Sequence, residues 1–406
     1  MSEPLYGPVA DWATDFDHAD PEYNRDLHAI WSELRGRCPV ARTERYGGVW
    51  LPVEHALIRE IAYDTEHFSN CGVMVSTIRS SGQPPVGSAP PISSDPPFHG
   101  PARRLLLPAF SPRRVAAWED RVRELCRERL DALGPVAPGG VVDAAAGYAQ
   151  HVPVHVIARM LGCPPEDDER MRGFVHELLE GVNRPVEAQK ATRAAVDAYL
   201  DALIERHRRE PADTLVTFLL EARMGGEPLS HHHLRGSILL LMLAGIDTTW
   251  SAIGSGLWHL AAHPAALARL VAEPALMDTA VEELLRAYAP VTMARMVVKP
   301  CEFHGHHMEP GEHVLLPFPA ANRDPAAFDR PDEVRLDREV NRHSAFGLGI
   351  HRCIGSNLAR LELRVALEEF IARFPAFELA DPAAVRWSTG QVRGPRRLPL
   401  RILATG

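Results

Sequence analysis

The segment between residues 230 and 263 constrains the fold of this chain more than any other. Ser230 is a suitable N-cap, no proline follows until Pro264, and residues 238–245 are apolar on every face of a helix. A helix that is apolar all round is buried, so this one is expected to cross the core of the protein. The Asp-Thr-Thr run at 247–249 would then place polar groups in the core, unless it lines a cavity.

The remaining pattern is also mainly helical. Helices are predicted over residues 24–35, from Ser111-Pro112 onward, over 186–208 and over 354–374, and short strands at 49–53 and in a hairpin at 301–317. The predicted fold class is therefore mainly α with a small β lobe. We expect one domain over residues 1–406, with a β-rich lobe at about 1–65, 301–320 and the C-terminal strands. Residues 76–97, dense in Ser, Gly and Pro, are predicted to form a long functional loop.

Charge, hydropathy and cysteine content exclude several classes of partner. With 44 basic and 53 acidic side chains the net charge is -9, so no general field attracts nucleic acid or an anionic membrane. The apolar runs are short of the ~20 residues of a membrane span, and residues 1–15 do not resemble a targeting signal, so we expect a soluble, cytoplasmic protein. The six cysteines form no CxxC pair and are read as reduced thiols.

Other familiar site patterns are weak or missing. Histidines gather at 231–233 and 304–313, which suggests a metal site as an alternative, but no carboxylate stands at a recognised spacing such as HExxH. No GxGxxG, GxxxxGK[ST] or GxSxG sequence stands between a strand and a helix. Dehydrogenase, P-loop and α/β-hydrolase functions therefore have no support.

The segment Phe346 to Gly355 combines a glycine-rich loop with Cys353 at the start of a buried helix. A helix N-terminus carries unpaired N–H groups and a partial positive charge, which favour thiolate over thiol. The glycines let a flat ligand approach the backbone closely. His351 and Arg352 add donors beside the sulfur. An isolated cysteine is more often a structural core residue, but this surrounding pattern favours a ligand site.

This segment resembles the haem-binding signature of the cytochrome P450 family, Phe-x-x-Gly-x-x-x-Cys-x-Gly, at Phe346, Gly349, Cys353 and Gly355. Three further family elements occur in family order. They are Asp95-Pro96-Pro97-Phe98-His99 with Arg103, the acid-alcohol turn Ala244-Gly245-Ile246-Asp247-Thr248-Thr249, and Glu283-Leu284-Leu285-Arg286. The resemblance implies the triangular, mainly helical cytochrome P450 fold.

The resemblance also implies a bound haem b (iron protoporphyrin IX). Cys353 would be the axial ligand of the iron, and thiolate ligation favours cleavage of the O–O bond. Basic side chains from separate segments would hold the propionates, and the loop would pack on the ring. The cofactor-binding residues implied in this way are His99, Arg103, Arg295, Phe346, Gly347, Gly349, His351, Cys353 and Gly355.

Two pairs receive roles by the same resemblance. Asp247 and Thr248 would deliver protons to oxygen, with the helix hydrogen bonds broken after Gly245 to admit dioxygen and a water. Glu283 and Arg286 would form a buried structural pair, although such a pair can equally lie on a surface. Its usual third member is an arginine, where this chain has Glu333; either Arg335 replaces it or the triad is incomplete.

The implied activity is insertion of one oxygen atom of O2 into a hydrophobic small molecule, by hydroxylation or oxidative dealkylation. Electrons would come from a ferredoxin and its reductase, and we expect a monomer. The run from Ala244 to Leu260 and the ending 390–395 look closest to members that dealkylate ethers, thiocarbamates or aromatic compounds. A natural-product tailoring enzyme is the alternative, followed by a peroxygenase or a non-catalytic haem protein.

Two further sets of residues are predicted from their positions relative to the motifs. The substrate-pocket residues are Met74, Leu240, Leu243, Ala244, Thr248, Val291, Thr292, Met293 and Gln391. The ferredoxin-binding patch comprises Arg104, Arg113, Arg114, Arg342, Arg352, Arg360 and Arg364.

Overall fold

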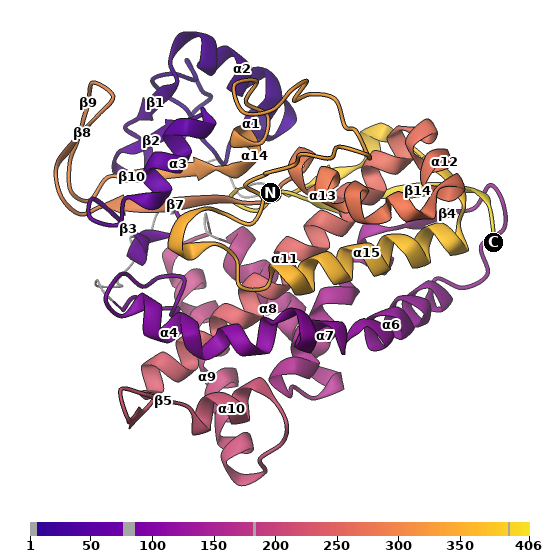
Figure 1. Cartoon of the computed structure of the whole chain (residues 1–406), viewed down its shortest axis with the longest axis horizontal. Coiled ribbons are helices and arrows are strands. Elements are labelled where there is room, and N and C mark those ends of the chain that lie inside the picture. The colour runs from indigo at the N-terminus through magenta and orange to yellow at the C-terminus, as the bar shows by residue number, and fades with distance from the viewer. Residues whose placement is uncertain (1–5, 76–85, 182–183, 389) are drawn as a thin grey trace.

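The structure, a computed structural model, describes residues 6–75, 86–181, 184–388 and 390–406. Most of these residues are helical (Figure 1). The α-helices are α1 (Pro21–Arg25), α2 (Leu27–Arg37), α3 (His55–Tyr63), α4 (His99–Leu106), α5 (Pro112–Ala116), α6 (Glu119–Ala132), α7 (His151–Leu161), α8 (Asp168–Glu180), α9 (Val186–Arg209), α10 (Leu215–Glu221), α11 (His231–Ala262), α12 (Pro264–Ala272), α13 (Met277–Ala287), α14 (Phe318–Ala321) and α15 (Ser356–Arg373).

Helix α11 is the central helix that the sequence predicts. The Ser230 hydroxyl accepts a hydrogen bond from the His233 N–H at 3.2 Å, and the helix ends before Pro264. Among the described residues it is the one helix whose length and composition would suit a membrane span, but 78% of its most apolar stretch is buried inside the protein. It is therefore a core helix.

The largest hydrophobic core forms where other helices pack around α11. Helices α7, α8, α9 and α15 all contact it, and α15 also packs against α6. In Figure 1, α11 and α15 lie side by side across the middle of the molecule. The α15 residues Leu363, Val365, Leu367 and Phe370 are almost completely buried, because this helix is apolar on two faces.

A five-stranded sheet lies beside the N-terminal helices. Its strand order is β1 (Val40–Thr43), β2 (Val49–Pro52), β10 (His313–Pro317), β7 (Thr292–Val297) and β3 (Phe68–Ser69). Strands β10 and β2 run parallel, and the other neighbours are antiparallel. In this register Arg295 of β7 lies opposite Val314 of β10, so the sheet brings a basic residue into the interior.

The remaining strands form smaller sheets. Strands β11 (Ala376–Leu379), β14 (Pro399–Ala404) and β4 (Val141–Asp143) make one sheet, and β12 (Arg386–Trp387) pairs with β13 (Pro395–Arg397). Strands β8 (Cys301–Phe303) and β9 (His306–Met308) form the projecting hairpin in Figure 1, and β5 (Arg223–Met224) pairs with β6 (Glu227–Pro228).

Most predicted elements agree with the structure, with differences at their ends and partners. The helix predicted over 24–35 is divided into α1 and α2, and the one predicted from Ser111-Pro112 stops at Ala116. The C-terminal strands, grouped in the prediction with the N-terminal β lobe, pair with β4 or with each other, while β7 joins the N-terminal sheet. Residues 76–85 of the predicted long loop lie outside the described residues.

Candidate active site

The cysteine loop is held in a shape that requires glycine. The Cys353 N–H donates to the Phe346 carbonyl at 2.8 Å, which closes the loop before α15. Gly349 has a φ of +67°, and a Cβ at this position would lie 2.4 Å from the Ala62 carbonyl oxygen of α3. Any other residue would push the loop away from α3. Cys353 thus stands three residues ahead of α15, rather than immediately before the helix as predicted, and it is exposed.

The electrostatics of Cys353 differ from the sequence prediction. The N-terminus of the helix was expected to favour thiolate, but the protein around the sulfur raises the pKa of the thiol above its usual value. The Gly355 N–H and the cations Arg103 and Arg352 act in the opposite direction and do not overcome this effect. The residue is accessible on one side and surrounded by protein on the others, so it remains able to ligate a metal from that open side.

Four basic side chains converge near this loop. His99 and Arg103 lie one turn apart on α4, Arg295 comes from β7, and His351 comes from the 3₁₀ turn η8 (Gly349–His351). The rings of His99 and His351 have centroids 4.2 Å apart. Arg103 donates to the Arg352 carbonyl, and Arg295 Nη1 to the Ala294 carbonyl at 2.8 Å. The structure therefore brings together all the residues predicted to bind propionates.

This basic cluster has too few acceptors for its donors. His99 Nε2 and both ring nitrogens of His351 are buried without a hydrogen-bond partner among the described residues. Burial and neighbouring cations lower the pKa of His99 to about 4 and that of His351 to about 2, and burial lowers the pKa of Arg295 to about 10. The nearby carboxylate of Asp95 already accepts from the Ser69 hydroxyl and the Asn70 N–H.

A bound dianion would supply the negative charge and the hydrogen-bond acceptors that this basic cluster lacks. The two propionates of a haem carry the charge and the acceptor oxygens that the cluster lacks, and an accessible thiol stands on the adjacent loop. The residues present therefore fit a haem held by Cys353 at the iron and by His99, Arg103, Arg295 and His351 at its acidic edge. Phe346, Gly347, Gly349 and Gly355 shape the loop beneath it.

Asp247 and Thr248 lie in the middle of α11 with different surroundings. Thr248 is half-buried and its hydroxyl donates to the Ala244 carbonyl at 2.8 Å, whereas Asp247 is 1% exposed. Burial raises the pKa of Asp247 to about 6, although the cation Arg396 partly opposes the shift. A carboxyl with a pKa near neutrality can both take up and release a proton at physiological pH. The predicted interruption after Gly245 is absent, because α11 is helical throughout residues 231–262.

An accessible stripe crosses α11 at the same level. Ala244 is exposed and Leu243, Gly245 and Thr248 are half-buried, while residues 236–242 and 249–257 on either side are buried. A helix inside a protein core exposes such a stripe only where it borders a space that a ligand or solvent can enter. Leu240, also predicted as a pocket residue, is buried one turn earlier.

The other predicted pocket residues meet at one point. The Gln391 side chain accepts from the Val75 N–H at 2.8 Å and donates to the carbonyls of Val73 and Thr292 at 3.3 and 2.9 Å. Its amide therefore fastens the segment containing Met74 to the start of β7. Thr292 and Met293 are half-buried on this strand, and Val291 forms a bridge to Val392.

The structure corrects the prediction for the third member of the Glu283–Arg286 network. Arg286 binds both Glu283 oxygens, at 2.8 and 2.9 Å, and both side chains are completely buried. The second arginine is Arg338, whose Nε donates to Glu283 at 2.9 Å. Arg335 contributes only its backbone N–H to Glu283, at 2.8 Å, and the Glu333 carbonyl accepts from Arg286. Burial opposes ionisation, yet these donors hold the pKa of Glu283 below its usual value.

The predicted ferredoxin patch is only partly free of ion pairs. Arg360 binds Glu282, and Arg364 binds Glu119 and Glu368. In the described part of the chain no ion pair involves the exposed residues Arg104, Arg113, Arg114, Arg342 and Arg352. Three of the histidines predicted as an alternative metal site bind carboxylates and share none of them: His231 binds Asp201, His304 binds Glu60, and His307 binds Glu302 and Glu309.

Three functional residues were not found from the sequence. Arg338 and Asn341 both bind Glu283, and Arg396 forms an ion pair with Asp247 at 2.7 Å. Each comes from a segment without a recognisable motif, so no local pattern marks it.

The fold and the site together define a haem protein with a thiolate ligand. The family model described as Cytochrome P450 matches residues 174–382. The mycinamicin IV hydroxylase/epoxidase of Micromonospora griseorubida is 33% identical over 92% of this chain and 96% of its own length, and the nocardicin C N-oxygenase of Nocardia uniformis is 35% identical over 92% and 95%. A crystal structure of CYP109E1 from Bacillus megaterium in complex with testosterone is 28% identical, with a TM-score of 0.85 over 94% of this chain and 99% of that chain.

The chain therefore belongs to the cytochrome P450 family. It is a haem b monooxygenase, which confirms the predicted fold class, cofactor and class of activity. The haem supplies the activation of dioxygen, from which one atom passes to the substrate. The residues that would hold the haem are Cys353 at the iron and the basic cluster at the propionates, and Asp247 and Thr248 on α11 are the groups that would hold and move protons.

Proposed function

We propose that this monooxygenase hydroxylates or oxidatively dealkylates an apolar small molecule that lies against the accessible stripe of α11. The observation that carries the proposal is the exposure of Ala244, with Leu243 and Thr248 half-buried beside it, between the buried stretches 236–242 and 249–257 of α11. The side chains of Leu243 and Ala244 carry no charge, so a substrate with an apolar surface is favoured here. Thr248 on the same stripe carries the hydroxyl that, in this proposal, takes part in proton delivery.

A binding screen followed by turnover tests this proposal. The holoenzyme is titrated with macrolides, steroids, terpenes and aryl ethers, and a shift in the spin state of the haem reports binding. Ligands that bind are then incubated with a surrogate ferredoxin, its reductase and ¹⁸O2. We expect a product that carries one ¹⁸O atom or has lost an alkyl group. Binding restricted to charged compounds, or products without ¹⁸O, would contradict the proposal.

A replacement within the stripe tests its location. Ala244→Phe fills the accessible side of α11 with a large ring, and we expect it to abolish the spin shift with bulky ligands while haem content stays normal. The control is Ala266→Phe on α12, where Ala266 is half-buried. Ala252→Phe on α11 is unsuitable as a control because Ala252 is buried. Equal loss of binding in both variants would place the ligand elsewhere.

A biosynthetic tailoring role is the second candidate, and the relatives favour it. Two of them are named for the oxidation of mycinamicin IV and of nocardicin C. This supports a natural-product substrate over the catabolism of a simple ether or aromatic compound. The screen above separates the two, because it includes both macrolides and aryl ethers.

We further propose a ferredoxin as electron donor, docked on the exposed arginines beside the cysteine loop. Arg104, Arg113, Arg114 and Arg352 are exposed on α4, α5 and the loop itself, and an acidic protein would complement them. Arg113→Glu/Arg114→Glu should slow reduction by ferredoxin at least tenfold and leave reduction by dithionite unchanged. The double variant Arg208→Glu/Arg209→Glu, at two exposed positions of α9, is the charge-matched control. An unchanged rate in Arg113→Glu/Arg114→Glu would remove this docking face.

A cytoplasmic location and a monomeric state stay predictions.

A further inference from the structure

The surroundings of Asp247 include groups that the acid-alcohol pair alone does not explain. Arg396 Nη2 lies 2.7 Å from Asp247 Oδ1, close enough for an ion pair. Apart from this ion pair, the two Asp247 oxygens have no hydrogen-bond partner among the described residues. A buried carboxylate in this state has acceptor sites open to water or to a proton.

Arg396 is fixed by contacts with two helices. Its Nε binds Glu180 at the end of α8, its Nη1 donates to the Ser251 hydroxyl of α11 at 3.0 Å, and its guanidinium carbon lies 4.9 Å from the centre of the Trp250 ring. Its own strand, β13, is pressed against α11. A Cβ on Gly394 would lie 2.3 Å from that of Ser251, so only glycine permits this approach. Arg396 therefore has one well-defined position between Glu180 and Asp247.

The charged groups continue from Arg396 to the surface. The Glu180 side chain is 20% exposed, and His176 Nδ1 lies 3.4 Å from Glu180 Oε1 one turn away on α8. The His176 side chain is 55% exposed. Its hydrogen bond with Glu180 raises the pKa of His176, so this residue carries a proton more often near neutral pH than an isolated histidine does.

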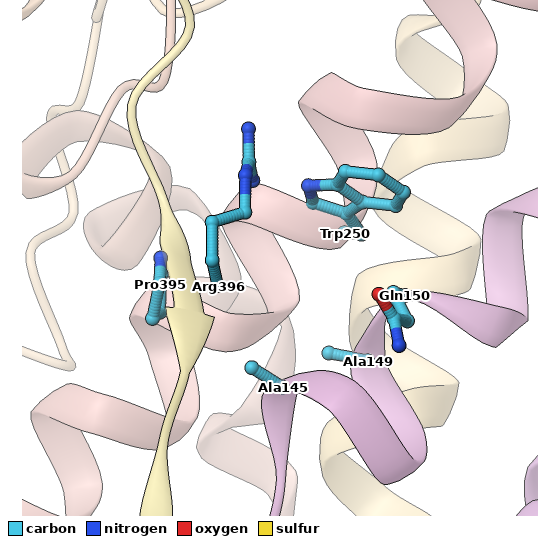
Figure 2. Close-up of a pocket in the computed structure, with 6 residues that line it drawn as sticks. All are labelled: Ala145, Ala149, Gln150, Trp250, Pro395 and Arg396. Atoms are coloured by element: carbon cyan, nitrogen blue, oxygen red, sulfur yellow. The ribbon is translucent and has the colours of Figure 1, made fainter. Parts of the chain in front are cut away.

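A small cavity lies beside Arg396. It has a volume of about 10 Å³, which suits one water molecule, and it is lined by Ala145, Ala149, Gln150, Trp250, Pro395 and Arg396. Figure 2 shows the indole nitrogen of Trp250 on the side facing Arg396. This nitrogen is buried and has no hydrogen-bond partner among the described residues, so it can donate to a water held here.

We propose that Arg396 is a positioning residue for proton supply, holding the Asp247 carboxyl next to a route from solvent that runs through His176 and Glu180. In this route a solvent proton is taken up at His176 or Glu180 and passes through water to Asp247, which becomes a neutral acid. Asp247 then releases that proton toward the Thr248 hydroxyl and is a carboxylate again. Arg396 keeps its charge throughout, because a guanidinium group does not release its proton in this pH range.

The proposal rests on the assignment of Asp247 and Thr248 as the proton-delivering pair. The charged groups that face Asp247 are Arg396 from β13 and Glu180 and His176 from α8. Arg396 and His176 favour the carboxylate and Glu180 disfavours it. Replacing Arg396 and replacing Glu180 should therefore shift the titration of Asp247 in opposite directions, which loss of packing alone would not do.

The first experiment measures the protonation of Asp247 directly in the ferric holoenzyme. Infrared difference spectra are recorded against pH, and the carboxylic acid band that Asp247→Asn removes is assigned to this residue. In Arg396→Gln the titration midpoint should rise by one pH unit or more, and in Glu180→Gln it should fall. Arg396→Lys should stay nearer to wild type, and Arg397→Gln, on the exposed neighbouring position, should leave it unchanged. An unchanged midpoint in Arg396→Gln would overturn the proposal.

The second experiment measures proton delivery during turnover with a surrogate ferredoxin and a ligand that shifts the spin state. Arg396→Gln and Glu180→Gln should release several times more hydrogen peroxide per electron than wild type, with a larger solvent deuterium isotope effect. Ligand binding and haem content should be retained, and Arg397→Gln should behave as wild type. Normal coupling in both variants would refute the route. A wild-type enzyme that oxidises none of the ligands would instead count against the proposed substrate class, and the infrared result would stand independently.

Discussion

The imidazole rings of His99 and His351 lie with their centroids 4.2 Å apart, although one comes from α4 and the other from η8. Burial lowers the pKa of both histidines, the cation Arg103 lowers both further, and Arg295 also lowers that of His351. Such a cluster is unfavourable on its own. It becomes favourable when an anionic group binds there, so the same residues should affect the haem-free and haem-bound protein in opposite ways.

Arg295→Met tests this opposition. Removing a charge-assisted hydrogen bond to a propionate costs about 1.5–3 kcal/mol, so haem affinity should fall roughly tenfold to a hundredfold. The haem-free protein should instead become more stable, because a buried cation is replaced by an apolar side chain of similar length. Haem transfer to apomyoglobin and thermal unfolding of the haem-free protein measure the two effects. A lower melting temperature of the haem-free variant would contradict the explanation.

A second prediction separates Arg338 from Arg335. Arg338 is 6% exposed and binds Glu283, so Arg338→Met leaves a buried carboxylate with fewer donors and should destabilise the protein by about 3–5 kcal/mol. Arg335→Met should change stability by less than about 1 kcal/mol, because among the described residues its half-exposed side chain forms an ion pair only with Asp329, at 3.6 Å, while its backbone N–H still binds Glu283. Urea unfolding measures both. Equal destabilisation would mean that the Arg335 side chain also supports the network.

These two arginines show where prediction from the sequence stops. The central helix, the cysteine loop and Glu283–Arg286 follow from residues that are neighbours in the chain, and each was predicted from a local pattern. Arg338 reaches Glu283 only because the irregular segment 329–341 folds back over α13, as its contacts with the Asp329 and Glu333 carbonyls show. No periodicity encodes such a path.

The same reasoning explains two site features that the sequence did not reveal. Arg396 meets Asp247 only through close packing of β13 on α11, which depends on Gly394 far from the acid-alcohol motif. The direction of the pKa shift of Cys353 depends on how closely the protein surrounds the sulfur. The sequence indicates the helix dipole and the nearby cations, but not the burial that outweighs them.

A third prediction concerns Thr248. Thr248→Ala removes the hydroxyl that donates to the Ala244 carbonyl and would relay protons on α11. Haem and ligand binding should be retained, while most reducing equivalents appear as hydrogen peroxide rather than product. Thr248→Ser keeps the hydroxyl and should restore much of the coupling. The ratio of product to electrons consumed measures the effect, and wild-type coupling in the alanine variant would remove this role.

The last prediction is a pH dependence of stability that arises far from the haem. Glu362 on α15 is 1% exposed, its Oε2 has no hydrogen-bond partner among the described residues, and burial raises its pKa well above the usual value. The folded protein therefore keeps this carboxyl protonated at pH values where the unfolded chain has lost the proton. Below the unfolded pKa of about 4.3, Glu362 is protonated in both the folded and the unfolded protein, so its titration does not lower stability. As pH rises from there toward the folded pKa, the folded protein becomes progressively less stable relative to the unfolded chain.

Glu362→Gln, a neutral side chain of the same shape, should therefore be more stable than wild type at pH 8. The difference should shrink by about 1.4 kcal/mol for each pH unit toward pH 5, within the range where only the unfolded chain titrates. Glu369→Gln is the matched comparison on the same helix. Arg127 and Arg123 hold the pKa of Glu369 below its usual value against the effect of burial, so this variant should be less stable than wild type at pH 8. Urea unfolding from pH 5 to pH 8 measures both, and a Glu362→Gln advantage that does not change with pH would show that packing, not ionisation, accounts for it.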